Sequence, residues 1–228
     1  MFDSVLIPIN RAGWPFIGGA FVLAIILGFL AEPLFWIGLL LTLFCVYFFR
    51  DPPRVTPQRD GLVVSPADGM LQMIEEAVPP PELDMGEEVR TRISVFLNVF
   101  DVHVNRVPIG GKITGLSYRP GAFLNAALDK ASELNERMSL KVETASGTEV
   151  AFIQIAGLIA RRIKCDVKQG EDVKTGQVFG LIRFGSRMDI YLPEGVAPLV
   201  APGQRMVAGE TVIADLTSDE VARSGMVR

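Results

Sequence analysis

The residues of this chain best suited to covalent chemistry are a serine, a histidine and an aspartate. Ser186 follows Gly185 in "IRFGSRMDIY", where an apolar run is interrupted by a Gly-Ser pair. A serine hydroxyl is a weak nucleophile until a base takes its proton. The chain contains one histidine, His103 in "FDVHVNRVP", and Asp68 stands in "SPADG". An acid that orients a histidine base beside a serine would form a nucleophilic triad.

Each of these residues also has a structural interpretation. A glycine inside a strand usually marks a bulge or a close approach of backbone, so Gly185 can simply be a bend. A single histidine on a strand, such as His103, more often has a structural role. An aspartate before a glycine, as at Asp68, is a common turn residue. None of the three signals identifies a catalytic site by itself.

The elements that must position these residues are mostly strands. Four segments carry β-branched, partly alternating runs punctuated by Gly and Pro: "LVVSPADGMLQMI", "RTRISVFLNVFDVHVNRVP", "GKITGLSY" and "SLKVETASGTEVAFIQIAGLIARRIKCDV". One helix is predicted over residues 122–137, because apolar residues recur there at helical spacings. These residues are Ala122, Leu124, Leu128, Ala131, Leu134 and Met138. The predicted fold class is therefore mainly β (α+β), with one or two helices.

An internal repeat specifies the β domain further. The segment from Val167 to Val178 returns 33 residues later as the segment from Val200 to Ile213. Two Gly-x-x-Val/Met-x-x-Gly turns between short strands resemble the barrel-sandwich hybrid of biotinyl and lipoyl carrier domains. The repeat indicates a quasi-symmetric β unit rather than a solenoid, because the period occurs only twice. Its four glycines are expected at turn positions that need positive φ: Gly170, Gly176, Gly203 and Gly209.

The N-terminal part is apolar enough to enter a membrane. Residues 12–49 contain a single charged residue, Glu32. As one helix this stretch would span about 57 Å, nearly twice a hydrocarbon core of about 30 Å. Glu32 and Pro33 lie in its middle, where a helix would break. We expect a hairpin of two short membrane helices, near 15–31 and 34–49.

The flanking arginines predict the orientation of this hairpin. Arg11 lies on one side, and Arg50, Arg54 and Arg59 lie on the other. Two spans return the chain to its starting side, and the arginines place that side in the cytoplasm. A re-entrant or interfacial hairpin stays open because each span is short. A cleaved signal peptide fits less well, since a second apolar run follows the first. A buried hairpin in a soluble core is the remaining alternative.

Three parts of the chain follow from these patterns. Residues 1–49 form the membrane-associated hairpin, and the Pro-rich charged segment 50–61 forms a linker. Residues 62–228 are long enough for one β domain with its own core. Two lone cysteines, Cys45 and Cys165, form no disulfide framework or metal-ligand spacing and fit a reducing compartment. The net charge of −4, without a basic run in the β domain, argues against nucleic-acid binding.

Together the motifs resemble the pyruvoyl-dependent phosphatidylserine decarboxylases in their short, bacterial-type form. The resemblance runs from Phe48 to the C-terminus, with the pieces in the family's order. The pieces are "YFFRDPPR", "SPADG", "FLNVFDVHVNRVP", "SYRPGAFLNAALDKASELNER", "IQIAGLIARRI" and "RFGSRMDIYLP". The Gly-Ser pair in a strand-like segment near the C-terminus is the most specific of them.

The resemblance implies that Gly185-Ser186 is a self-cleavage site. Attack of the Ser186 hydroxyl on the Gly185 carbonyl, elimination and hydrolysis would leave a pyruvoyl group on residue 186 and two chains, 1–185 and 186–228. The pyruvoyl carbonyl, with neither a metal nor pyridoxal phosphate, would form a Schiff base with phosphatidylserine and act as an electron sink. Loss of CO2 and hydrolysis would then release phosphatidylethanolamine.

The resemblance also assigns roles to other residues. It implies that Asp68 and a histidine activate Ser186. The family's long form has H-x-x-H, whereas this chain has His103 followed by Arg106 at the second position. Two divisions of labour stay open: His103 supports both cleavage and later proton transfer, or Asp68 acts without a histidine in the first step. Arg106 is a candidate for the substrate carboxylate or phosphate, with a structural salt bridge as the alternative.

Two further segments are candidates for contact with the substrate. The family-like "NER" segment, Asn135 to Arg137, lies either at the entrance to the site or at a structural helix end. Arg161, Arg162 and Lys164 form a small basic cluster that suits either anionic headgroups or a solvated strand edge.

The resemblance implies a partner and a location. Phosphatidylserine is practically absent from water, so a domain tethered to the cytoplasmic side of the inner cell membrane would meet it by lateral diffusion. The two chains would remain partners in one domain, and the sequence leaves a homo-oligomer open. Two rival hypotheses keep the chain whole. One is a non-enzymatic membrane adaptor with a lipoyl-like β domain. The other is a serine-dependent membrane hydrolase that uses Ser186, Asp68 and His103 directly.

Overall fold

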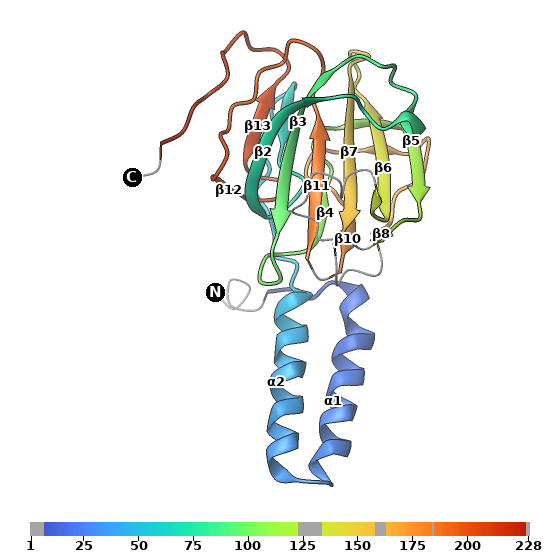
Figure 1. Cartoon of the computed structure of the whole chain (residues 1–228), viewed down its shortest axis with the longest axis vertical. Helices are drawn as coiled ribbons and strands as arrows, with labels where there is room; N and C mark the ends of the chain where they lie inside the picture. Colours follow the sequence, from blue (N-terminus) through green and yellow to red (C-terminus); the bar gives the residue numbers. More distant parts are fainter. Residues whose placement is uncertain (1–6, 123–133, 158–162, 184, 227–228) are drawn as a thin grey trace. The chain divides into compact units, whose positions relative to one another are not determined.

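The computed structural model describes residues 7–122, 134–157, 163–183 and 185–226. The chain divides into two compact units, Met1–Pro53 and Arg54–Arg228. The first unit is a helical pair and the second is a β domain (Figure 1). The predicted class, mainly β with an N-terminal apolar hairpin, is confirmed. The finer three-part division, with a separate linker, stays a prediction.

Two apolar helices make up most of the first unit. They are α1, Trp14–Gly28, which follows the 3-10 turn Arg11–Gly13, and α2, Glu32–Phe48. They approach closely where side chains are small. A Cβ added to Gly38 would lie 2.6 Å from the Cα of Ala24. Small residues at a helix crossing let two apolar helices pack backbone to backbone, as is common in membranes.

The turn of the hairpin lies a few residues earlier than predicted. Glu32 and Pro33 were expected to separate the helices, but they form the first turn of α2. Proline is favoured in the first turn because its missing N–H would have no intrahelical partner there. Ala31, with extended backbone at φ −162° and ψ 139°, precedes the helix as its N-cap. The proline therefore starts the second helix instead of ending the first.

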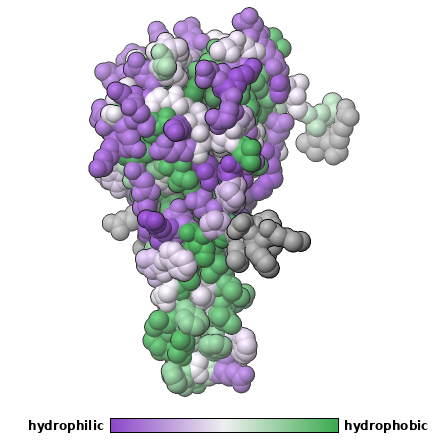
Figure 2. All heavy atoms as spheres, turned by 180° about the vertical axis from the view of Figure 1, so that it is seen from behind, coloured by the Kyte–Doolittle hydropathy of each residue, from purple (hydrophilic) through white to green (hydrophobic). Residues whose placement is uncertain are grey.

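The surface of the helical pair is largely apolar (Figure 2). Residues 11–28 form the described helical segment that is long and apolar enough to cross a membrane, and 11% of it is buried. Helix α2 has 17 residues and is therefore shorter than this 18-residue segment, which also includes the 3-10 turn before α1. Large side chains stay exposed on both helices, among them Phe21, Ile26, Trp36, Ile37 and Leu40. Exposed apolar surface of this extent is compatible with membrane association.

The β domain consists of short and medium strands with one 3-10 turn. The strands are β1 Leu62–Val64, β2 Gly69–Ala77, β3 Arg90–Leu97, β4 Val104–Arg106, β5 Gly111–Arg119, β6 Arg137–Glu143, β7 Glu149–Ala156, β8 Ile163–Cys165, β9 Asp172–Val173, β10 Val178–Ile182, β11 Ser186–Tyr191, β12 Arg205–Met206 and β13 Val212–Asp215, and the turn is η2 Pro81–Leu83. They form three antiparallel sheets. The largest has the order β12-β2-β3-β11-β7-β6-β5-β9, and the others are β4-β10-β8 and β1-β13.

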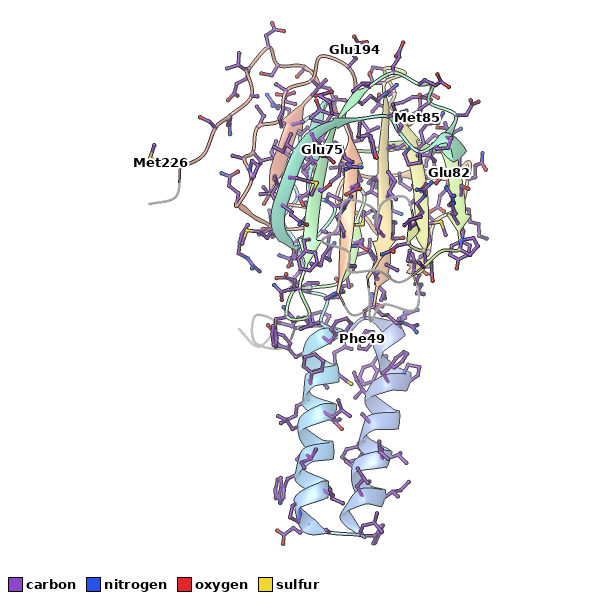
Figure 3. All side chains as sticks on the ribbon, viewed as in Figure 1. Phe49, Glu75, Glu82, Met85, Glu194 and Met226 are labelled. Carbon is purple, nitrogen blue, oxygen red and sulfur yellow. The ribbon has the colours of Figure 1, made fainter. Side chains whose placement is uncertain are left out.

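The centre of the large sheet is buried on both faces. On β7, Phe152 and Ala156 pack into the main core, while Ile153 and Ile155 pack on the opposite face. The opposite face is covered by the segment between β2 and β3, which carries Leu83 and Met85. Figure 3 labels Met85 and Glu82 on this covering segment. Burial on both faces explains why "AFIQIA" reads as a nearly continuous apolar run.

The internal repeat folds as predicted, into two equivalent turns. All four glycines have positive φ: Gly170 at 85°, Gly176 at 77°, Gly203 at 91° and Gly209 at 75°. In the first copy β9 pairs with β5, and in the second β12 pairs with β2. The two copies therefore complete opposite edges of the large sheet.

The helix predicted over 122–137 falls mainly on residues 123–133, which lie outside the described residues. Its C-terminal end was predicted wrongly. Asn135 forms an isolated bridge with Ala122, and Arg137 opens strand β6. Pairing of β6 with both β5 and β7 decides the conformation of this segment, over its local helical spacing.

Candidate active site

The Gly-Ser pair lies where the chain passes from one sheet to another. Strand β10 of the three-stranded sheet ends at Ile182, and β11 of the large sheet begins at Ser186. Gly185 precedes β11 with φ +71°, a region that side-chain-bearing residues rarely adopt. A Cβ added there would meet nothing within 4 Å. The backbone conformation, rather than crowding, is therefore the reason for glycine at this position.

Ser186 is fully buried at the start of β11, an inner strand of the large sheet. It pairs with Leu97 on β3 and with Ala156 on β7, and its exposure is 0%. Its Oγ has no hydrogen-bond partner among the described residues. A buried hydroxyl without a partner costs about 1–3 kcal/mol, so native proteins rarely keep one without a reason. This hydroxyl is therefore a candidate for a reaction at the Gly-Ser junction.

His103 contacts the residue before Ser186. The Gly185 N–H donates to His103 Nε2 at 3.2 Å, and His103 Nδ1 lies 3.0 Å from the carbonyl oxygen of Asp101. A carbonyl can only accept and a backbone N–H can only donate. Nδ1 therefore carries the hydrogen, and Nε2 presents its lone pair. The histidine, 1% exposed, is held as a neutral base directed at the Gly-Ser junction.

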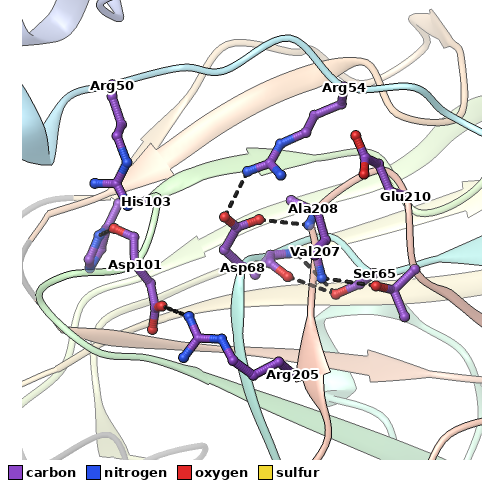
Figure 4. A network of polar contacts seen from close by, with 12 residues as sticks. Arg50, Arg54, Ser65, Asp68, Asp101, His103, Arg205, Val207, Ala208 and Glu210 are labelled. Atoms are coloured by element: carbon purple, nitrogen blue, oxygen red, sulfur yellow. Dashed lines mark hydrogen bonds and ion pairs between the residues drawn. The ribbon is translucent and has the colours of Figure 1, made fainter. Parts of the chain in front are cut away.

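Asp101, which the sequence analysis did not single out, orients His103. Its backbone carbonyl accepts the hydrogen of His103 Nδ1 and so fixes the imidazole tautomer. Its carboxylate has two partners of its own. Asp101 Oδ2 accepts from the Asn98 N–H at 2.9 Å, and Oδ1 pairs with Arg205 (Figure 4). The signal was present in the quoted motif "FDVHVNRVP", where an aspartate stands two residues before the histidine.

Asp68 lies in the same region, but its carboxylate has other partners. Oδ2 accepts from Arg54 Nη2 at 2.7 Å, and Oδ1 accepts from the Ala208 N–H at 2.7 Å (Figure 4). Within the described part of the chain, no hydrogen bond joins this carboxylate to His103 or Ser186. The structure thus brings His103 to the Gly-Ser junction and leaves Asp68 paired with an arginine.

The internal symmetry explains one of these two contacts. Asp68 lies outside the repeat, just before β2, the strand that pairs with β12 of the second copy, and Ala208 precedes the repeat glycine Gly209. At the equivalent place in the other copy, the Gly110 N–H donates to Thr175 Oγ1 at 2.8 Å. Both copies therefore close the same turn with one side-chain oxygen and one backbone N–H. One oxygen of Asp68 is structural, and the Arg54 contact is the feature that distinguishes this copy.

The other candidate residues are engaged with the protein. Arg106 Nη1 donates to the Gly176 carbonyl at 3.1 Å. Asn135 Nδ2 donates to the carbonyl of Ala156, the residue paired with Ser186, at 2.7 Å. Asn135 thus contacts β7, the strand next to the one that begins at Ser186. Arg161 and Arg162 lie outside the described residues, and Lys164 is paired with Asp166.

Arg137 forms a two-point ion pair on the other face of the sheet. Its Nε and Nη2 each lie 2.7 Å from a carboxylate oxygen of Glu82, which Ser139 Oγ also contacts at 2.8 Å. Burial raises the pKa of Glu82, but the hydrogen bonds from Arg137 and Ser139 outweigh it and leave that pKa below its ordinary value. The geometry of Arg137 is that of a structural ion pair.

A second buried ion pair anchors the strand that begins at Ser186. Arg187 Nε and Nη2 donate to the two oxygens of Asp189 at 2.7 and 2.8 Å, and Ser94 Oγ adds 2.7 Å to Oδ1. Arg187 and Asp189 are 0% and 1% exposed. Buried charges are tolerated when they are fully paired in this way. The pair fixes β11 immediately after the serine.

Within the described ranges, no group of three or more His, Cys, Asp or Glu side chains is arranged to hold a metal ion. Among the described residues, the polar groups at the junction include an imidazole, a hydroxyl without a partner and a backbone amide. They suit proton transfer and acyl chemistry at a serine.

Comparison with known proteins gives one consistent result. The family model described as phosphatidylserine decarboxylase matches residues 41–214. A phosphatidylserine decarboxylase proenzyme of Paramagnetospirillum magneticum is 63% identical over 221 residues, covering 97% of this chain and 92% of that protein. Proenzymes of the same name from Cereibacter sphaeroides and Ruegeria pomeroyi are 58% and 57% identical, covering 100% and 95% of this chain and 98% and 99% of their own lengths.

Proposed function

The chain belongs to the phosphatidylserine decarboxylase family of carboxy-lyases, and from this premise we propose that it matures by cutting its own backbone between Gly185 and Ser186. The observation that carries the proposal is the buried, unpartnered Ser186 hydroxyl beside a glycine that is bound to a neutral histidine. The relatives' name, proenzyme, supports a cleaved product.

The cleavage uses only groups of the chain and water. Ser186 Oγ adds to the Gly185 carbonyl carbon, the C–N bond between the two residues breaks, and the hydroxyl proton ends on the new amine. The result is an ester. Removal of the Ser186 Cα proton expels Gly185 as a carboxylate, and hydrolysis of the remaining unsaturated residue releases ammonia. A pyruvoyl group then caps residue 186.

His103 is the base available for this sequence. Its Nε2 lone pair already points at the Gly185 N–H, and its Nδ1–H is held by the Asp101 carbonyl. To take a proton, Nε2 must exchange the Gly185 N–H for a group at Ser186. This exchange needs only a local change at the junction.

We assign Asp68 to the activation step as well. To act on His103, its Oδ2 must leave Arg54, because Oδ1 closes the turn with Ala208. The residues left as substrate-binding candidates, Arg106, Asn135 and Arg137, have the protein contacts described above. Of these, Asn135 binds the carbonyl of Ala156, the residue that pairs with Ser186.

The pyruvoyl carbonyl supplies an electron sink for decarboxylation of the serine headgroup, which converts phosphatidylserine to phosphatidylethanolamine. The chain's contribution is to bury residue 186 between two strands and to keep a neutral base beside it. The apolar helical unit supports membrane association, and the arginines on its flanks favour the cytoplasmic side of the inner membrane.

The intact mass of the purified protein tests the proposal. Two fragments are expected, 1–185 and 186–228, and a hydrazine reagent should label the smaller one at its ketone. The Ser186→Ala variant should remain a single chain without activity. A membrane adaptor or a serine hydrolase would keep the wild-type chain whole. An active preparation that stays one chain of 24.9 kDa would refute self-cleavage.

A further inference from the structure

Two buried amide side chains lie in the core next to the Gly-Ser junction. Gln154 on β7 and Asn105 on β4 are both 0% exposed. Gln154 Nε2 donates to Asn105 Oδ1 at 2.9 Å, which links the large sheet to the three-stranded sheet. Within the described part of the chain, Gln154 Oε1 and Asn105 Nδ2 have no partner.

The pair has an unused donor and an unused acceptor in either orientation of the amides, and in the orientation found the unused carbonyl belongs to Gln154. If both amides were turned over, the hydrogen bond between Gln154 and Asn105 would run in the opposite direction. One carbonyl and one NH2 group would still be without a partner. The core therefore contains one unused acceptor and one unused donor between the two sheets.

The pair and the serine lie on the same side of the sheet. Ser186 pairs with Ala156, and Gln154 lies two residues before Ala156 on the same strand. Because strand side chains alternate, Gln154, Ala156 and Ser186 share one face. Diagonal neighbours on adjacent strands are within reach of a long side chain. Ala156, between them on β7, is small enough to leave that path open.

The surrounding backbone makes room for the amides. Gly180 on β10 pairs with Asn105, and a Cβ added to Gly180 would lie 3.2 Å from Gln154 Nε2. That Cβ would also lie 2.1 Å from the Lys164 carbonyl oxygen. Glycine is required at position 180 by the close backbone of β8, and it also leaves room for the end of the Gln154 side chain.

We propose that Gln154, held by Asn105, is a positioning residue for self-cleavage, whose amide carbonyl accepts the hydroxyl hydrogen of Ser186. The two atoms are complementary: Ser186 offers a buried O–H without an acceptor, and Gln154 offers a buried carbonyl without a donor. They belong to diagonal neighbours on adjacent strands, which a long side chain can bridge. This inference rests on the proposed function, because it concerns the hydroxyl that attacks Gly185.

The hydrogen bond has a defined consequence for the reaction. It selects one rotamer of Ser186 and keeps the hydroxyl hydrogen on an acceptor until Oγ closes on the Gly185 carbonyl carbon. The proton then leaves for the base. Positioning of the reacting atoms before attack is a large part of the gain in intramolecular reactions. Without the amide, Oγ would sample its rotamers freely.

The test follows cleavage of the full-length chain over time after cell-free synthesis, with the fragments separated on a denaturing gel. Gln154→Met keeps the size of the side chain and removes the acceptor. We expect it to slow cleavage at least about tenfold. Thr114→Val is the matched control, because Thr114 Oγ1 is another buried atom without a partner, on β5 away from the junction. The control should cleave at the wild-type rate.

Hydroxylamine separates positioning of the attack from a later step. It cleaves the ester that follows attack by Oγ, whether or not elimination occurs. Gln154→Met should lose spontaneous and hydroxylamine-dependent cleavage to the same degree. Cleavage of Gln154→Met at the wild-type rate would overturn the inference, as would an ester that accumulates to the wild-type level.

The effect of the substitution on folding is measured in the Ser186→Ala chain, which cannot cleave itself. Gln154→Met combined with Ser186→Ala should melt at the temperature of Ser186→Ala alone. If methionine lowers that temperature, Gln154→Glu decides, since it keeps an acceptor oxygen at the same place. Faster cleavage than in the methionine variant supports the inference, and an equal rate overturns it. If the wild-type chain itself stays whole, the proposed function fails instead.

Discussion

The backbone N–H of Gly185 donates a hydrogen bond to Nε2 of His103, 3.2 Å away. The single histidine of the chain is therefore bound to the residue on the N-terminal side of the proposed cut. The contact forces the neutral imidazole with its hydrogen on Nδ1, because the other partner of the ring is a carbonyl. A base and a scissile junction are thus joined before any reaction.

His103→Gln tests whether this contact is chemical or structural. Glutamine has a carbonyl that can accept the Gly185 N–H, but it cannot take a proton at neutral pH. If His103 is the base, the variant should fold and cleave about 100-fold or more slowly, the usual scale for a lost general base. The time course of fragment formation measures this effect. Wild-type cleavage by His103→Gln would show that the histidine only holds the backbone.

Gly185→Ala tests the role of the unusual backbone. A side chain at φ +71° costs about 1–2 kcal/mol, although it would meet no neighbour. We expect a lower melting temperature and slower cleavage, because relaxation of φ moves the carbonyl that Ser186 attacks. Gly147→Ala is the control: Gly147 has φ +81° and equally open surroundings in the turn between β6 and β7. The control should lose similar stability and cleave normally.

Asp68→Asn should keep the turn and remove the charge. The amide oxygen can still accept the Ala208 N–H, so the turn contact survives. If the charge of Asp68 serves the activation of Ser186, cleavage should slow about 100-fold or more. The melting temperature should fall as well, because the ion pair with Arg54 is lost. Arg54→Ala releases Oδ2 and should not slow cleavage. Equal slowing by both variants would mean that the ion pair itself is required, and would contradict direct action of Asp68.

Much of the fold could be predicted because its signals are local. The glycines of the repeat mark positive φ in both copies, and apolar spacing marks the helices and strands. The end of the 122–137 helix was predicted wrongly, because pairing with two neighbouring strands outweighs local spacing at Arg137. Glutamate and proline occur on either side of a helix boundary. The sequence alone therefore did not show that Glu32 and Pro33 begin the second helix, and the predicted boundary was wrong.

The candidate site could be predicted only in part, because its contacts join distant segments. The Gly-Ser pair and His103 carry recognisable motifs, and the structure brings them together. The pairing of Asp68 with Arg54 has no local signal. Gln154 did have one, since a glutamine inside the apolar run "AFIQIA" breaks the pattern of a strand buried on both faces.

Acid should destabilise the domain through Glu82. Its pKa in the folded chain lies below the ordinary value of 4.5. Its ionised form therefore contributes stability that is fully present above about pH 4.5 and is lost as the pH falls through the lowered folded pKa. Denaturant unfolding of the Ser186→Ala chain at several pH values should show this loss. Glu82→Gln should be less stable at pH 7 and should depend less on pH in this range.

Arg137→Met tests the ion pair between Arg137 and Glu82 by removing the arginine. The substitution leaves the Glu82 carboxylate, 16% exposed, with only Ser139 and local backbone as partners. We expect a loss of about 3 kcal/mol at pH 7, the scale for stripping one partner from a buried ion pair. Activity per cleaved molecule should stay unchanged if Arg137 is purely structural. A selective rise in KM for the phospholipid would instead assign it to substrate binding.

Cleavage should not separate the two chains. The smaller chain would begin with β11, which lies between β3 and β7 of the larger chain along its whole length. Its other strands, β12 and β13, pair with β2 and β1. Every strand described within residues 186–226 is thus hydrogen-bonded to the larger chain, and Met188 and Ile190 fill the shared core. The fragments should elute together in detergent without denaturant and separate only when the sheet unfolds. Release of the smaller chain under native conditions would contradict this, because after cleavage only noncovalent contacts would hold residue 186 beside His103: strand pairing, core packing and polar contacts such as that of Asp101 with Arg205.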